Sequence, residues 1–86
     1  MEKELMQVIL DQMQNHGKVF SSDLEEYRTG TLVEYSFDPQ KKCFIVTEAD
    51  IIVGSFCDQK ILSRQEIEQR LQNYPISEFI QAGFTL

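Results

Sequence analysis

The sequence predicts a single α+β domain, in which an N-terminal helix precedes a three-stranded antiparallel meander, and a C-terminal helix with a short helical tail follows. Two patterns lead to this class. Apolar residues recur at helical spacing near both ends of the chain, whereas in the middle they alternate with polar residues. A chain of 86 residues supports one hydrophobic core, so we expect residues 1–86 to form one domain.

The first helix is predicted from an apolar stripe near the N-terminus. Leu5, Ile9 and Met13 recur every four residues and share one face of a helix. The helix ends near His16, because Gly17 can adopt the left-handed conformation that satisfies the last helical carbonyls. The one histidine of the chain thus lies where the helix dipole favours a cation, which explains it without a catalytic role.

A second, short helix is predicted over residues 23–27. Ser22 stands three residues before Glu25, which is the spacing of a capping box. Gly30 limits the length of this helix, because glycine favours turns.

Two central strands are predicted over residues 31–37 and 43–47, where apolar and aromatic side chains recur every second position. Asp38 and Pro39 begin a polar turn between them, so the two strands form a hairpin. The favoured register places aromatic residues opposite aromatic or β-branched ones: Phe37 opposite Phe44, and Tyr35 opposite Val46.

The third strand is predicted over residues 51–56, after a polar interruption at residues 48–50. Both faces of the resulting sheet are partly apolar, with Phe44 on one face and Ile45 on the other. Something must therefore cover both faces. Helices on opposite sides would do so, and so would helices on one side with a second copy of the chain on the other, which leaves a homodimer open.

The last helix is predicted to begin after Ser63, which stands three residues before Glu66 at capping-box spacing, and to end at Pro75. Apolar residues at helical spacing give it an inward face: Ile67, Leu71 and Tyr74. The tail keeps several apolar residues, so we expect it to pack as a further helical turn that Gly83 closes.

The charge of the chain argues against nucleic acid as a partner. Eight basic and fourteen acidic side chains give a formal charge of −6, which repels phosphate backbones. Two basic pairs remain as candidates for a small positive patch: Lys41 with Lys42, and Arg64 with Arg70. No stretch approaches the roughly 20 apolar residues of a membrane-spanning helix, and the N-terminus does not resemble a signal peptide, so the expected location is the cytoplasm.

The two cysteines, Cys43 and Cys57, lie in apolar stretches and are interpreted as reduced core residues. If the third strand brings Cys57 beside Cys43, a disulfide is the alternative. Apolar surroundings make these thiols poor nucleophiles, and no base is placed beside them.

Neither a catalytic constellation nor a metal site is recognisable. The acidic pair Glu48 and Asp50 is explained by the polar interruption between strands, and the cluster at residues 23–26 by the start of a short helix, where carboxylates are favoured. The chain contains no CxxC, HxxxH or calcium-loop motif. We therefore expect no enzymatic activity, no cofactor and no metal; an enzyme would require a dimer that brings residues of two chains together.

The stretch VILDQMQNHGKVFSSDLEEY resembles the opening of a winged helix domain: a helix, a glycine turn, an extended piece and a second helix. This resemblance implies an alternative function as a DNA-binding transcriptional regulator. The sequence departs from the pattern after Tyr27, where Arg28, Thr29 and Gly30 lead directly into strand residues instead of the helix that reads the major groove.

The favoured function is that of a non-enzymatic protein–protein interaction module: a small acidic adaptor, inhibitor or regulatory protein. The expected partner is a protein with a basic surface, whose affinity falls with salt. The predicted contact residues combine carboxylates with an aromatic and a basic side chain: Asp23, Glu25, Glu26, Tyr27 and Arg28. An exposed sheet edge is the second candidate surface.

Overall fold

The computed structural model describes residues 1–22, 31–50 and 57–86, and the structural statements below refer to these residues. The elements follow one another in this order: α1 (Lys3–His16), β1 (Phe20–Ser22), β2 (Thr31–Asp38), β3 (Cys43–Asp50), β4 (Cys57–Leu62), α3 (Arg64–Leu71) and α4 (Ile76–Gln81). The strands form one antiparallel sheet in the order β1-β2-β3-β4. The α+β class is confirmed, with four described strands in place of the predicted three.

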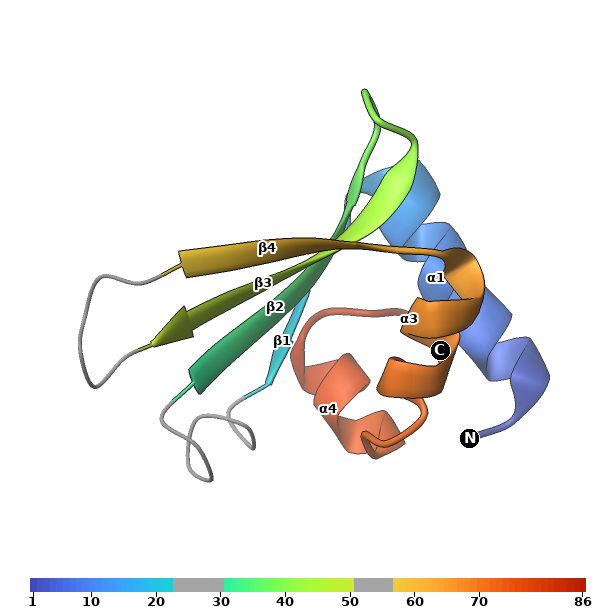
Figure 1. Cartoon of the computed structure of the whole chain (residues 1–86). Coiled ribbons are helices and arrows are strands. Elements are labelled where there is room, and N and C mark those ends of the chain that lie inside the picture. The colour runs from blue at the N-terminus through green and yellow to red at the C-terminus, as the bar shows by residue number, and fades with distance from the viewer. Residues whose placement is uncertain (23–30, 51–56) are drawn as a thin grey trace.

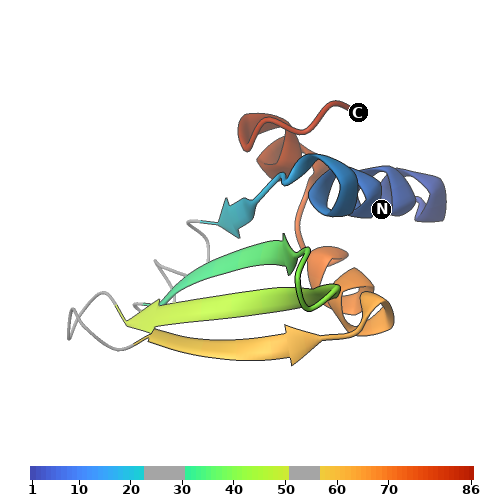
Figure 2. The same cartoon turned by 90° about the horizontal axis from the view of Figure 1, so that it is seen from above.

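The helices lie on one side of the sheet. Figures 1 and 2 show α1, α3 and α4 on the same side, while the opposite side of β2, β3 and β4 carries none of the described helices. Helix α1 contacts β2, and α3 contacts β3 and β4. The described helices therefore cover a single face of the sheet, and a second copy of the chain on the other face stays a prediction.

Helix α1 follows the prediction closely. It ends at His16, and Gly17 takes a left-handed conformation with φ of 67°. The exposed fraction of the side chain is about zero for Ile9 and Met13, which face the sheet, whereas Leu5 is half-buried at the margin of this stripe. Amphipathic spacing and a glycine stop are therefore sufficient to define this helix.

The central hairpin has the predicted register. Phe37 pairs with Phe44, and Tyr35 pairs with Val46. The rings of Phe37 and Phe44 meet edge to face, with centroids 5.0 Å apart. The turn is stabilised by Asp38, whose Oδ1 accepts hydrogen bonds from the backbone N–H groups of the residues two and three positions later, at 2.9 and 3.2 Å.

The second half of the sheet differs from the prediction. The sequence predicts an interruption at residues 48–50, but β3 continues through them to Asp50. Their backbone pairs with β2 as far as Thr31, so the ladder to a neighbouring strand, rather than side-chain polarity, decides where β3 ends. The last strand is Cys57–Leu62, and the strand predicted over residues 51–56 lies outside the described residues.

A short strand, β1, precedes the three strands of the predicted meander. Strand β1 has three residues, and it pairs with β2 so that Phe20 lies opposite Tyr35. Three residues are too few to show an alternation of two, so only the pairing with a distant strand defines β1.

The predicted alternative of a disulfide is wrong. Cys43 is a free cysteine. Its register partner is Asp38 at one end of β3, whereas Cys57 pairs with Ala49 near the other end. At about 3.3 Å per residue this separates the two cysteines by about 20 Å, far beyond the roughly 6.8 Å that a disulfide tolerates between Cα atoms.

The C-terminal segment divides earlier than predicted. Helix α3 ends at Leu71 instead of continuing through Tyr74, whose backbone N–H donates to the carbonyl of Leu71 at 3.2 Å. Helical geometry is disfavoured for a residue that precedes proline, and here Pro75 is the N-cap of α4.

Helix α4 closes as the tail pattern predicts. Gly83 has a φ of 96°, and its N–H donates to the carbonyl of Ile80 at 3.1 Å. The next N–H, that of Phe84, donates to the carbonyl of Phe79 at 3.0 Å. These two bonds form a Schellman motif, which directs Phe84 back into the core.

The core lies between the helices and the inner face of the sheet, and aromatic rings make up its centre. The ring of Phe20 stacks on Phe79 with centroids 4.3 Å apart and meets the ring of Tyr74 edge-on at 5.1 Å. Tyr35 and Phe84 complete the cluster at centroid distances of 6.3 and 6.4 Å from Phe20. The short strand β1 thus contributes the central side chain of the core.

The capping box predicted at the start of α3 is confirmed. The backbone N–H of Glu66 donates to Oγ of Ser63 at 3.1 Å, and the backbone N–H of Ser63 donates to Oε1 of Glu66 at 3.1 Å. The hydrogen bond from the Ser63 backbone lowers the pKa of the Glu66 carboxyl, and the Ser63 hydroxyl and the charge of Arg70 lower it further. The ionised carboxylate is therefore the form that stabilises the fold.

This lowered pKa implies a pH dependence of stability. The contribution of ionised Glu66 is fully present above the ordinary pKa of a glutamate in the unfolded chain and is lost as the pH falls through the lowered pKa of the folded protein. Glu66→Gln keeps the geometry of the box but does not titrate. In urea unfolding measured across this acid range, the wild type should lose more stability than Glu66→Gln; parallel pH curves for the two proteins would contradict this role.

Candidate functional site

The predicted contact residues do not contribute to a described site. Asp23, Glu25, Glu26, Tyr27 and Arg28 lie outside the described residues, together with the short helix predicted there. Their role stays a prediction. The candidate site is therefore built from the surfaces of the described sheet.

One such surface is the side of the sheet that carries none of the described helices. Because side chains alternate along a strand, every second residue of β2, β3 and β4 points to this side. We call these side chains the open face: Leu32, Glu34, Ser36, Asp38, Cys43, Ile45, Thr47, Ala49, Gln59 and Ile61. Their neighbours in sequence, such as Val33 and Val46, are buried against the helices.

The open face has two apolar patches. At one end Ile61 lies directly opposite Ile45, and the exposed fraction of Ile61 is 64%. At the other end Leu32 lies opposite Ala49, and both side chains are half-buried. An isoleucine this exposed near the end of a strand is apolar surface that the described monomer leaves in water.

A polar row separates the two patches and gives the open face its charge. Glu34 lies opposite Thr47, which lies opposite Gln59, and the amide Nε2 of Gln59 donates to Oγ1 of Thr47 at 3.5 Å. Glu34 is exposed. The described side chains of this face include two acidic residues and no basic one, so apolar and negatively charged surface occur together.

A shallow groove of about 470 Å³ continues from the Ile61 patch around the end of the sheet. It is lined by apolar and polar side chains of α1, the hairpin, β4 and the start of α3: Gln14, Phe37, Lys42, Cys43, Phe44, Ile61, Leu62, Ser63, Arg64 and Glu66. In the described part of the chain no hydrogen bond joins Cys43 to a base. The groove can accommodate an apolar side chain of a bound protein, but it holds no recognisable nucleophile–base pair.

One basic residue at this groove, Arg64, connects two helices. The Arg64 guanidinium donates to Oε1 of Gln7 at 2.7 Å, to Oε1 of Gln14 at 3.1 Å and to Oδ1 of Asp11 at 3.0 Å. These bonds fasten the start of α3 to α1. The expected positive patch of Arg64 with Arg70 is therefore not formed by free cations, because Arg70 approaches Glu48 at 4.0 Å.

Sequence reasoning missed these hydrogen bonds, because nothing in the spacing connects α1 with residues fifty or more positions later. Gln12 is a second example. Its Nε2 donates to the carbonyl of Thr85 at 2.7 Å, and its Oε1 accepts from the Thr85 N–H at 3.0 Å. A surface glutamine therefore holds the C-terminal tail against α1.

The candidate acid–base residues do not converge. His16 is exposed at the end of α1. Glu48 lies on the inner side of β3, directly opposite Asp58 of β4, and the side chain of Asp50 lies outside the described set. Lys41 and Lys42 are exposed in the hairpin turn. The described residues contain no group of three metal-ligating side chains, and none of their helices is long and apolar enough to span a membrane.

The chain matches no protein-family model, and comparisons with curated proteins and with solved structures likewise find no match. Residues 23–30 join β1 to β2, and the next described helix, α3, follows β4. Helix α1, the turn at Gly17 and strand β1 match the helix, turn and extended piece of the winged helix opening. The second helix of that pattern falls on residues outside the described ranges, and DNA binding stays a prediction.

Proposed function

We propose that this protein is a non-enzymatic interaction module of the cytoplasm, which docks on a protein partner and acts as a small adaptor, inhibitor or regulator. The observation that carries the proposal is the open face, which combines the exposed Ile61 and half-buried apolar side chains with acidic ones and has none of the described helices over it. Apolar surface with charges beside it is typical of the core and rim of a protein interface.

The Ile61 patch supplies the binding energy in this proposal. Fully burying an isoleucine side chain is worth about 1.5 to 3 kcal/mol. Ile61 and Ile45 face the same side from adjacent strands, so one partner surface can cover both. The adjoining groove adds a recess for a partner side chain.

The charge of the chain selects the partner. A net charge of −6 and the acidic residues of the open face favour a basic surface and accelerate its association at low salt. The predicted contact residues 23–28 would add three carboxylates to the same attraction.

Capture from cell extract with two matched variants tests this proposal. Ile61→Lys places a charge on the open face, and Ile80→Lys places the same charge on α4, where the isoleucine is similarly exposed at 57%. We expect a protein with a basic surface to be retained by the wild type and by Ile80→Lys, and its affinity to fall at least about tenfold with Ile61→Lys.

Raising the salt concentration should release this partner, because complementary charges are screened. Equal retention by both variants at all salt concentrations would contradict docking through the open face. An enzyme activity that is lost with Glu48→Gln would instead support the catalytic alternative.

A further inference from the structure

The edge of the sheet formed by β4 is unpaired in the described structure. β4 (Cys57–Leu62) has β3 on one side only, and Figure 2 shows no other segment beyond it. The outward backbone N–H and C=O groups of such a strand can form a ladder with another strand. The side chains of β4 decide which strand fits.

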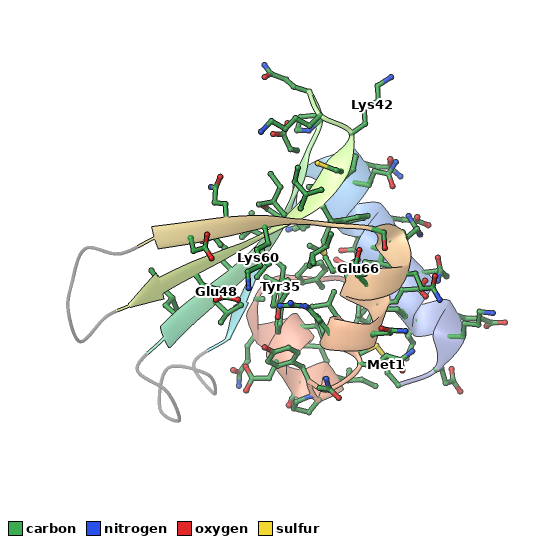
Figure 3. All side chains as sticks on the ribbon, viewed as in Figure 1. Met1, Tyr35, Lys42, Glu48, Lys60 and Glu66 are labelled. Atoms are coloured by element: carbon green, nitrogen blue, oxygen red, sulfur yellow. The ribbon has the colours of Figure 1, made fainter. Side chains whose placement is uncertain are left out.

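Two opposite charges stand on the same face of β4. Asp58 and Lys60 are two positions apart, so both point to the inner side, and neither is buried. Figure 3 labels Lys60, Glu48 and Tyr35 in the same region of the sheet. The register places Tyr35, Val46 and Lys60 in one row across the strands. Lys60 lies where the helices no longer cover this side.

The charge of Asp58 is poorly matched within the monomer. Its register partner on β3 is Glu48, and like charges directly opposite each other destabilise a sheet. Glu48 is approached by Arg70 at 4.0 Å. Among the described residues no ion pair is formed by Asp58 or by Lys60. The free side of β4 is therefore where a cation would stabilise Asp58.

We propose that β4 pairs with β4 of a second copy of this chain, antiparallel and about a twofold axis at Gln59. In this register Asp58 lies opposite Lys60 of the second copy, and Lys60 lies opposite its Asp58. Both charges then have an opposite partner across the strands, which stabilises a sheet. The result is one continuous sheet with the helices of both copies on the same side.

The charges select this register over its neighbours. A twofold axis perpendicular to the sheet keeps inner side chains opposite inner ones, so the register can shift only so that the axis passes through another residue. With the axis at Asp58, two aspartates face each other; with the axis at Lys60, two lysines do. Only the axis at Gln59 pairs opposite charges on both sides.

This pairing leaves the side chains of the open face uncovered. Ile61 comes opposite Cys57 of the second copy, and the two open faces adjoin on the same side of the joined sheet. The proposal concerns the edge and does not rest on the proposed docking to a basic partner. Lysines on edge strands can also prevent the addition of another strand, in which case the wild type would stay monomeric in the experiment below.

Charge exchange measured by analytical ultracentrifugation tests the pairing. The wild type should show a concentration-dependent monomer–dimer equilibrium. Asp58→Lys creates Lys–Lys contacts and Lys60→Asp creates Asp–Asp contacts, so each variant alone should dimerise at least about tenfold more weakly. Glu78→Lys on α4 makes the same change in net charge as Asp58→Lys and should dimerise like the wild type.

An equimolar mixture of Asp58→Lys and Lys60→Asp should form a heterodimer, because each then presents only one sign of charge to the other. The double variant Asp58→Lys/Lys60→Asp should recover the homodimer. A wild type that stays monomeric over the whole concentration range, or a mixture that stays monomeric, would overturn the proposal. Capture of a basic partner by Asp58→Lys separates this result from the proposed function, since the open face is unchanged.

Discussion

Replacing Phe20 by alanine is expected to lower the free energy of unfolding by about 3 to 5 kcal/mol. The side chain is fully buried, and its ring lies against four others, with centroids from 4.3 to 6.4 Å away. A domain of this length has a total stability of about 4 to 13 kcal/mol, at about 0.05 to 0.15 kcal/mol per residue. The substitution should therefore leave a substantial fraction of the protein unfolded.

Urea unfolding followed by circular dichroism measures this loss. The matched control is Val19→Ala, one residue earlier, where the side chain is 42% exposed and the cost should stay within about 0.5 kcal/mol. If Phe20→Ala cost no more than Val19→Ala, strand β1 would not hold its central side chain in the core.

Much of this fold could be predicted because its signals are local. The stripe of α1, the glycine stop after it and the capping box of Ser63 and Glu66 each act within a few residues. The register of the central hairpin is similarly local, because the turn at Asp38 fixes which residues face each other.

The sequence-based predictions fail where pairing with a strand distant in sequence decides the structure. The backbone of residues 48–50 is held in β3 by the start of β2, although acidic residues there favour a turn when considered alone. Strand β1 is defined only by its pairing with β2, and β4 only by its pairing with β3. The propensities of neighbouring residues do not indicate which distant strands form these ladders.

The candidate site could be predicted in part. An apolar Ile45 on the side opposite Phe44 showed that both faces need cover, but the sequence left open what covers the second face. All described helices lie on one side, so none of them covers the second face. The sequence pattern indicates neither the position of Asp58 nor the exposure of Ile61, because it predicts no strand over Cys57–Leu62. The strand that it predicts over residues 51–56 lies outside the described residues.

The rate at which an introduced thiol reacts should differ strongly between the two faces of the sheet. In a background with Cys43→Ser and Cys57→Ser, a thiol is introduced by Val46→Cys on the inner face or by Ile61→Cys on the open face. Val46 is fully buried, whereas Ile61 is 64% exposed. A thiol at position 46 can react only when the protein opens, and global opening of a domain with about 5 kcal/mol of stability lowers the rate by at least about a thousandfold.

The accessibility of these two thiols tests the central claim, that helices cover one face of the sheet and leave the other open. The measurement is the rate of reaction with a thiol reagent, relative to the same variants in urea. We expect Cys at position 61 to react nearly as fast as in the unfolded chain, and Cys at position 46 to be protected. Equal protection at both positions in dilute monomeric protein would show that the face is covered and would contradict the account.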